Sequence, residues 1–174
     1  CYVALHAADS AQLFAALGAG RHFCRAVRLD RPADGGGGGG DAAPRPAFVG
    51  WVGDEALDRG VVALARPFAD CVGLREGDEV DARAAPEAPA APAVMVQPDS
   101  SDDWEVVELQ AGFIEENLLS QVAVLAPGMV FPVWIHGQMP VKLRVDARDE
   151  NRSECFLLAR DTELMVEAKQ RAAA

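Results

Sequence analysis

The chain has 174 residues, half of them hydrophobic, and its 27 Asp and Glu against 16 Lys and Arg give a formal net charge of −11. This length allows a buried core in one domain or in two small ones. An acidic surface repels phosphate, so nucleic acid is not expected as a partner, and no apolar run approaches the ~20 residues that cross a bilayer. Four scattered cysteines form no CxxC pair, so we expect buried thiols in a reducing, cytoplasmic compartment.

Short strands and two helices are predicted in the first half of the chain. Apolar alternation marks the strands, and Pro in a first turn or Gly after a last turn marks the helices. The predicted elements are strands at 2–6, 23–29, 47–52 and 94–96, a helix from Asp9 or Ser10 to Gly18 or Gly20, and a helix led by Pro67 and ended by Gly73.

Two segments of the first half read as loops. Residues 32–46 contain six successive glycines, and no Lys-Ser/Thr follows them, so a disordered loop is expected there and not a phosphate site. Residues 84–92 are rich in Ala and Pro, which predicts a poorly packed surface loop.

The second half predicts strand, helix and then four strands. Its helix carries an apolar face that starts at Ile114, and Pro127-Gly128 should end it. The predicted elements are a strand at 104–109, a helix at 114–125, strands at 130–135 and 141–145, and a hairpin of 155–159 with 164–166 around a turn at 160–162. We place a boundary between two subdomains, 1–97 and 98–174.

Several short motifs of the second half carry a family resemblance. They are Asp102-Asp103-Trp104-Glu105, Leu118-Leu119 with Gln121, Phe131-Pro132-Val133-Trp134 and Asp161-Thr162-Glu163-Leu164. This half resembles the N-terminal domains of type II AAA ATPases, most closely those of the peroxin-1 family of peroxisome-biogenesis ATPases. It is also similar to the N domains of valosin-containing protein and the N-ethylmaleimide-sensitive fusion ATPase. Residues 47–52 extend the resemblance upstream, and the segment 67–80 resembles a half-barrel unit of double-psi barrels.

The resemblance implies a mostly-β or α+β fold. A double-psi β-barrel lobe (1–97) would be followed by a smaller α/β barrel-like lobe (98–174) that ends in a linker to ATPase modules. The chain would then be a fragment without cofactor or catalytic residues of its own, because the ATP sites would lie outside it and no Walker motif is present.

The resemblance also implies a function. The chain would be a non-catalytic docking domain for adaptors or substrates of the peroxisomal import and export machinery. With a peroxin-6 partner, the intact ATPase would extract the ubiquitinated import receptor from the peroxisomal membrane, which places the domain in the cytoplasm, peripheral to that membrane. A groove between the lobes is the expected docking site, and we expect Asp102, Asp103 and Trp104 to border it.

An alternative from another class is a peripheral module that binds phosphoinositides or other anionic lipids. Four arginines of the first half form its basic cluster: Arg21, Arg25, Arg28 and Arg31. Each could add on the order of 1 kcal/mol near an anionic surface. Such contact would be weak against a net charge of −11.

The sequence contains no motif that indicates an enzyme active site or a metal site. The three histidines, 6, 22 and 136, lie in unrelated contexts, and Asp161-Thr162 is followed by Glu163 instead of the glycine of an aspartic-peptidase turn. We expect Asp161 to accept backbone hydrogen bonds in its own turn. We expect core positions for Trp51 and Trp134, and no metal site, since His22-x-Cys24 and Asp102-Asp103-Glu105 are incomplete ligand sets.

Overall fold

A computed structural model describes residues 1–15, 24–32, 45–56, 58–85, 88–147 and 153–167. The strands are β1 (Val3–Leu5), β2 (Arg25–Asp30), β3 (Ala47–Trp51), β4 (Val62–Leu64), β5 (Asp81–Ala84), β6 (Ala93–Pro98), β7 (Val124–Leu125), β8 (Val130–Ile135), β9 (Met139–Val145), β10 (Phe156–Leu157) and β11 (Glu163–Val166). The helices are α1 (Ala7–Phe14), α2 (Arg66–Cys71), α3 (Ser101–Leu109) and α4 (Ala111–Gln121). This content confirms the mostly-β or α+β class.

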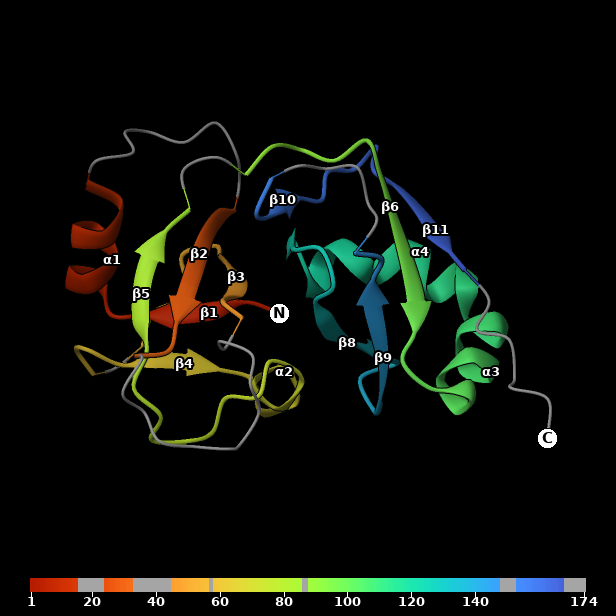
Figure 1. Cartoon of the computed structure of the whole chain (residues 1–174), viewed down its shortest axis with the longest axis horizontal. Helices are drawn as coiled ribbons and strands as arrows, with labels where there is room; N and C mark the ends of the chain where they lie inside the picture. Colours follow the sequence, from red (N-terminus) through yellow and green to blue (C-terminus); the bar gives the residue numbers. More distant parts are fainter. Residues whose placement is uncertain (16–23, 33–44, 57, 86–87, 148–152, 168–174) are drawn as a thin grey trace.

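The strands form separate sheets in two lobes that lie side by side (Figure 1). The first lobe contains the three-stranded sheet β3-β2-β5, the pair β1-β4 and helices α1 and α2. The second lobe contains the four-stranded sheet β11-β6-β9-β8, the pair β10-β7 and helices α3 and α4. None of these sheets closes on itself within the described residues, so the double-psi barrel and the barrel-like second lobe stay predictions.

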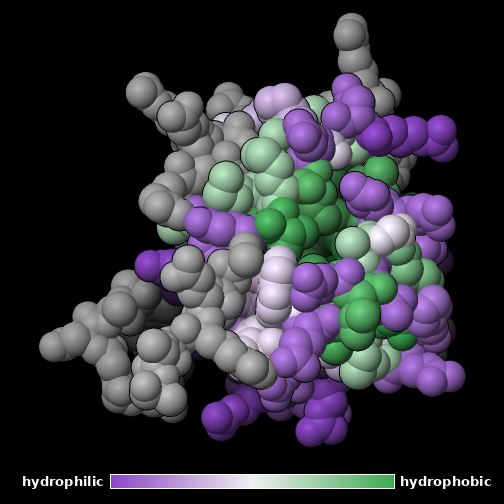
Figure 2. Space-filling view, turned by 90° about the vertical axis from the view of Figure 1, so that its right-hand side faces the viewer, coloured by the Kyte–Doolittle hydropathy of each residue, from purple (hydrophilic) through white to green (hydrophobic). Residues whose placement is uncertain are grey.

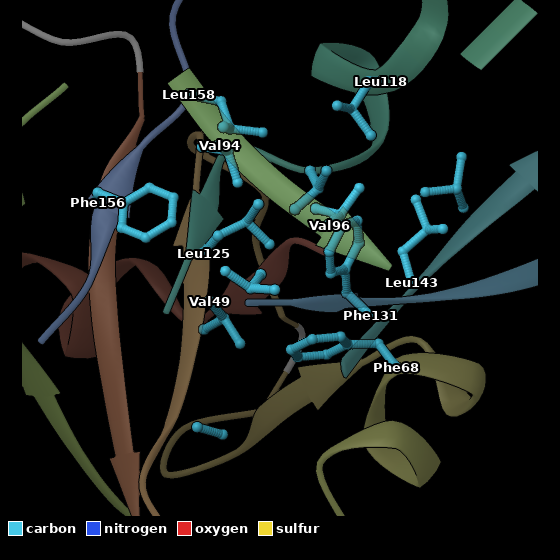
Figure 3. Packing of buried hydrophobic residues seen from close by; sticks show 14 of the residues in the cluster. Val49, Phe68, Val94, Val96, Leu118, Leu125, Phe131, Leu143, Phe156 and Leu158 are labelled. Atoms are coloured by element: carbon cyan, nitrogen blue, oxygen red, sulfur yellow. The ribbon is translucent and has the colours of Figure 1, made fainter. Parts of the chain in front are cut away.

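One hydrophobic core joins the two lobes. Val49 of β3 and Phe68 of α2 belong to the same buried cluster as Leu125, Phe131 and Phe156 of the second lobe (Figure 3). No sheet crosses from lobe to lobe in the described part of the chain, so apolar side-chain packing, and not strand pairing, connects them. The predicted boundary after residue 97 stays a prediction; β6 spans it and pairs with β9 and β11.

Local patterns correctly predicted many of the elements. The predicted strand at 130–135 coincides with β8, and Val141, Leu143 and Val145 of β9 are buried while the residues between them are exposed. Pro67 lies in the first turn of α2, as predicted, and Gly73 follows that helix with φ of 71°. The predicted glycine-rich loop lies largely outside the described residues.

The predicted strand at 104–109 is wrong, because these residues belong to helix α3. Ser100 caps the helix: its Oγ accepts a hydrogen bond from the Asp103 backbone N–H at 3.0 Å and donates one to Asp103 Oδ2 at 2.6 Å. Asp102 and Asp103 also place negative charge in the first turn, where it favours a helix. These start signals outweigh the strand preference of Val106 and Val107.

The next helix is shorter than predicted. It begins at Ala111 and ends at Gln121, so residues 122–125 are extended and form β7 at their end. The Gln121 side chain bonds twice to the backbone of Trp134, donating to its carbonyl at 3.0 Å and accepting from its N–H at 2.6 Å. Residues 122–125 are buried throughout, so the predicted one-faced helical pattern does not apply to them.

The predicted hairpin of 155–159 with 164–166 is wrong as well. β10 pairs with β7 in antiparallel fashion, and β11 pairs with β6 in parallel. The turn between them is held by Thr162 and not by Asp161: Thr162 Oγ1 accepts from the Ala159 N–H at 2.8 Å and donates to the Ala91 carbonyl at 2.7 Å.

The Ala/Pro-rich segment packs better than predicted. Ala91 is buried, and its N–H donates to the Leu157 carbonyl at 2.9 Å. The Leu157 N–H in turn donates to the Pro89 carbonyl at 2.8 Å. Hydrogen bonds to β10 therefore order this segment, although its Ala/Pro-rich sequence has no apolar pattern. Residues 86 and 87 of the segment lie outside the described part.

The first helix starts earlier than predicted and has a different cap. His6 is the N-cap, and its Nδ1 accepts a hydrogen bond from the Ala8 N–H at 3.2 Å. Ser10 lies within the helix and is buried, and Asp9 instead bonds to the Gly60 N–H at 2.6 Å through Oδ2. The predicted stops at Gly18 and Gly20 lie outside the described residues. No helix in the described ranges is both long and apolar enough to cross a bilayer.

Candidate functional site

A groove of about 600 Å³ lies at the junction of the two lobes. The first lobe contributes the ends of β2 and α2 and the start of β3, and the second lobe contributes the β7–β8 connection, β9 and the approach to β10. The lining residues are Arg31, Arg45, Pro46, Ala47, Phe48, Cys71, Val72, Ala126, Pro127, Gly128, Met129, Val130, Arg144, Ser153 and Glu154.

The floor of the groove is apolar. Phe48 and Ala126 are buried in a small cluster that contains residues of both lobes, and Met129 packs against this cluster. Met129 and Val130 are half-buried, so their side chains remain partly open to solvent. Such a surface is suited to the burial of an apolar side chain from a ligand.

Three arginines border this floor. Arg144 donates to Asp99 at 2.7 Å, whereas Arg31 donates to the backbone carbonyls of Val72 and Gly73. The Arg45 side chain reaches from the segment before β3 to the second lobe: a Cβ added to Gly128 would lie 3.1 Å from Arg45 Nη1. The described part of the groove rim is therefore mainly basic.

The position of Arg31 follows from the end of α2. Helix C-termini present carbonyl groups without intrahelical partners, and a guanidinium is a suitable donor for them. Gly73 has φ of 71°, and a Cβ on it would lie 2.9 Å from Arg31 Nη2. Glycine is thus required here both by the backbone and by the close approach of Arg31.

The acidic group of the groove is already paired. Glu154 Oε1 accepts from Arg28 Nη1 at 2.7 Å, and Arg28 Nε donates to both carboxylate oxygens of Asp30 at 2.9 and 3.0 Å. These hydrogen bonds raise the pKa of Arg28. The Arg28–Glu154 pair also links β2 of the first lobe to the second lobe.

The cysteines are free thiols. Cys24 and Cys155 are buried, as predicted, and desolvation raises the pKa of each to about 11. Cys71 and Cys1 are only half-buried. Desolvation also raises the pKa of Cys71. A thiol with a raised pKa is a poor nucleophile at neutral pH, so the Cys71 side chain adds apolar surface to the groove.

The partner residues predicted from the sequence lie elsewhere. Asp102, Asp103 and Trp104 are on the first turn of α3 and do not line the groove. Asp103 also accepts from the Lys142 N–H at 3.2 Å, which fixes α3 to β9. Their role in partner binding stays a prediction, on a surface separate from the groove.

The predicted arginine cluster is not gathered on one face. Arg25 lies 5.0 Å from the Phe14 ring centroid, Arg28 is ion-paired, and Arg31 bonds to the end of α2. Residues 25 and 28 are an odd number of positions apart on β2, so their side chains leave opposite faces. Arg21 lies outside the described residues, and lipid contact by this cluster stays a prediction.

The two tryptophans expected in the core are only half-buried. Trp51 stacks on Phe14 with ring centroids 5.0 Å apart and packs against the main core. Its Nε1 donates to the Asp54 carbonyl at 3.1 Å, so the polar edge of the ring faces outward. Trp134 lies on β8 with intermediate exposure.

The described histidines have structural contacts. His6 caps α1, whereas His136 lies in the β8–β9 turn with φ of 49°. His136 Nε2 lies 3.2 Å from Gln110 Oε1, and the centroid of the His136 ring lies 4.2 Å from that of the Phe113 ring. Asp161 is exposed in the turn before β11. These groups belong to separate elements, and the described ranges hold no group of three or more His, Cys, Asp or Glu placed to bind a metal.

Most residues of the groove could not be singled out from the sequence. Arg45 lies between two prolines next to the glycine-rich segment, and Met129 follows Pro127-Gly128 in the β7–β8 connection. Both positions read as loop. The only available signal was an arginine beside a predicted strand start, which is too common to mark a site.

Comparisons with known proteins identify related peroxisomal proteins. Residues 92–168 match the family described as peroxisome biogenesis factor 1, N-terminal. The chain is 33% identical over 132 residues to the human peroxisomal ATPase PEX1, and 31% identical over 127 residues to that of Dictyostelium discoideum. These alignments cover 74% and 71% of the chain but 10% of each relative, so the chain spans about a tenth of the length of the curated relatives it matches.

By these matches, the chain is similar to the N-terminal parts of peroxisomal ATPases. More narrowly, it belongs to the family of peroxin-1 N-terminal domains. The resemblance seen in the short motifs of the second half is thereby confirmed.

Proposed function

We propose that this chain is a non-catalytic docking domain, which holds adaptors or substrates of the peroxisomal import machinery for an ATPase motor. The observation that carries the proposal is the groove at the lobe junction, with its half-buried apolar floor and charged rim. Protein-binding surfaces commonly combine an apolar centre with a polar border. The described residues bring no nucleophile, base and orienting acid together.

The finer parts of the proposal follow from the family. The intact protein is an ATPase whose nucleotide sites lie outside these residues. It works with a peroxin-6 partner to extract the ubiquitinated import receptor, on the cytoplasmic side of the peroxisomal membrane. The matched relatives carry the name peroxisomal ATPase, which supports the ATPase and peroxisome parts of this proposal.

The test is a capture experiment with the 174-residue chain as bait. Cytosol and peroxisomal membranes are applied with and without added anionic vesicles, and bound proteins are identified by mass spectrometry. Specific recovery of an import receptor, its adaptor or a ubiquitin conjugate, unchanged by the vesicles, is expected. Recovery only with anionic membranes, and its loss at high salt, would favour the lipid-binding alternative instead.

A further inference from the structure

The groove reverses the charge balance of the chain. The whole chain has 27 acidic against 16 basic residues, but the charged residues in the described part of the groove lining are three arginines and one carboxylate, Glu154. A concave surface with low-dielectric walls focuses the field of such charges. The groove is therefore a local basic site on an acidic protein.

Two of the three arginines have no carboxylate partner among the described residues. Arg31 is bonded to neutral carbonyl groups, and Arg45 forms no ion pair with a described carboxylate. Glu154 is in contrast neutralised by Arg28 at 2.7 Å. The charge that the groove offers to a ligand is thus positive, and guanidinium groups bind carboxylates through paired hydrogen bonds.

The apolar floor adds a second requirement. Met129 and Val130 line the groove together with the arginines and are partly open, and Val72 adds apolar surface from the first lobe. Methionine adapts its shape to the side chains that it contacts. A purely charged ligand would leave this floor uncovered, whereas a large apolar side chain would bury it.

We propose that the groove binds an acidic segment of a partner protein, in which one or more carboxylates meet Arg45 and Arg31 and a large apolar residue lies on Met129. This inference rests on the docking function proposed above and names the chemistry of its ligand. The acidic remainder of the chain repels such a segment, so the groove is where binding is favoured, and the same repulsion adds specificity.

The experiment uses fluorescent synthetic peptides of twelve residues, rich in Glu and Asp and containing Leu or Phe at varied spacings. A matched set carries Lys in place of every acid. Binding to the 174-residue chain is measured by fluorescence anisotropy. Only the acidic–apolar peptides should bind, and their affinity should fall as the salt concentration rises from about 50 to about 500 mM.

Substitutions identify the site. Arg45→Glu should weaken binding by about tenfold or more, because it places a carboxylate against the ligand. Arg160→Glu makes the same charge change at an exposed position of the β10–β11 turn and should leave affinity unchanged. Met129→Gln should also weaken binding, whereas Met139→Gln at the exposed start of β9 should not.

Equal binding of the Lys peptides, or loss of affinity to the same extent in Arg45→Glu and Arg160→Glu, overturns the inference. So does binding of phosphatidylserine vesicles that depends on Arg45 while acidic peptides fail to bind. Failure of the peptides together with successful capture of import proteins refutes only the ligand chemistry. Failure of the capture experiment refutes the docking function itself.

Discussion

Gly50 of β3 occupies a position where the surroundings leave no room for a side chain. A Cβ there would lie 2.7 Å from the Cys24 Sγ and 3.0 Å from Tyr2 Cδ1. The tyrosine cannot easily move, because its hydroxyl donates to the Leu119 carbonyl of α4 at 2.8 Å. Gly50 therefore allows β1, β2 and the second lobe to approach one another.

We predict that Gly50→Ala lowers the free energy of unfolding by about 1–3 kcal/mol, the usual cost of overpacking a core. Urea denaturation followed by circular dichroism measures the change. Gly112→Ala in α4 is the matched control, since an added Cβ meets nothing within 4 Å there. The control should raise stability by about 0.5–1 kcal/mol through helix propensity. Equal effects of the two substitutions would contradict the close contact at Gly50.

The buried thiols give a prediction for pH. The pKa of Cys24 and of Cys155 is raised from 9.0 to about 11 by desolvation, so the folded chain binds these protons more tightly than the unfolded chain. Below about pH 9 both thiols are protonated in the folded and the unfolded chain, so their ionisation does not change the stability there. As the pH rises from 9 towards 11 the thiols ionise more readily in the unfolded chain, and the free energy of unfolding falls. Urea midpoints at pH 8 and pH 10.5 measure this fall, and a Cys24→Ala/Cys155→Ala variant should reduce it. A fall of the same size in that variant would assign the effect to other groups.

The start of α3 shows how a local signal decides the type of an element. The sequence around Trp104 alternates like a strand, but Ser100 and Asp103 form a reciprocal pair of hydrogen bonds that begins a helix. The last residue of this helix, Leu109, has 80% of its surface accessible.

Figure 2 shows the side of the molecule on which α3 and β11 lie, where hydrophobic surface is exposed between polar side chains.

Ser100→Ala should lower the free energy of unfolding by about 1 kcal/mol, because the Asp103 N–H loses its acceptor. Thermal and urea unfolding give the value. Ser120→Ala is the control, since Ser120 is exposed within α4 and donates only to the Asn117 carbonyl at 2.7 Å. A cap that contributes nothing would show the same small change at both serines.

On the scale of the molecule, the shared core has a consequence for unfolding. Phe68 of the first lobe has 1% of its surface exposed and belongs to the cluster that includes Phe131 and Phe156 of the second. Separating the lobes would expose these side chains, so neither lobe should unfold by itself.

We predict one cooperative transition, measured with single-tryptophan variants. A Trp104→Phe/Trp134→Phe chain reports on the first lobe through Trp51, and a Trp51→Phe/Trp104→Phe chain reports on the second through Trp134. Each variant should show the same urea midpoint by tryptophan fluorescence as by circular dichroism. Phe68→Ala should shift both probes together, with a loss of about 3–5 kcal/mol.

The ion pair between the lobes provides the control for this prediction. Glu154 is 72% exposed in its side chain, so its attraction to Arg28 is screened by solvent. Glu154→Ala should therefore leave both midpoints close to those of the parent chain. Two separate transitions in the parent would show that the apolar junction does not couple the lobes.

The sequence by itself determined those features that depend on neighbours a few residues away. The alternation of Val141, Leu143 and Val145 and the Pro67 start of α2 are local consequences of backbone geometry, and both are confirmed. The family could also be identified from short motifs of the second half, which lie within the matched residues 92–168.

Only the tertiary structure decided which strands pair and where the groove lies. β10 and β11 are neighbours in the sequence, but β7 and β6 supply their partners, and Gln121 ends α4 by bonding to Trp134. Arg45 and Met129 are far apart in the sequence and meet only when the two lobes share a core. The physical reason is that burial and long-range hydrogen bonds act between segments whose proximity no local pattern encodes.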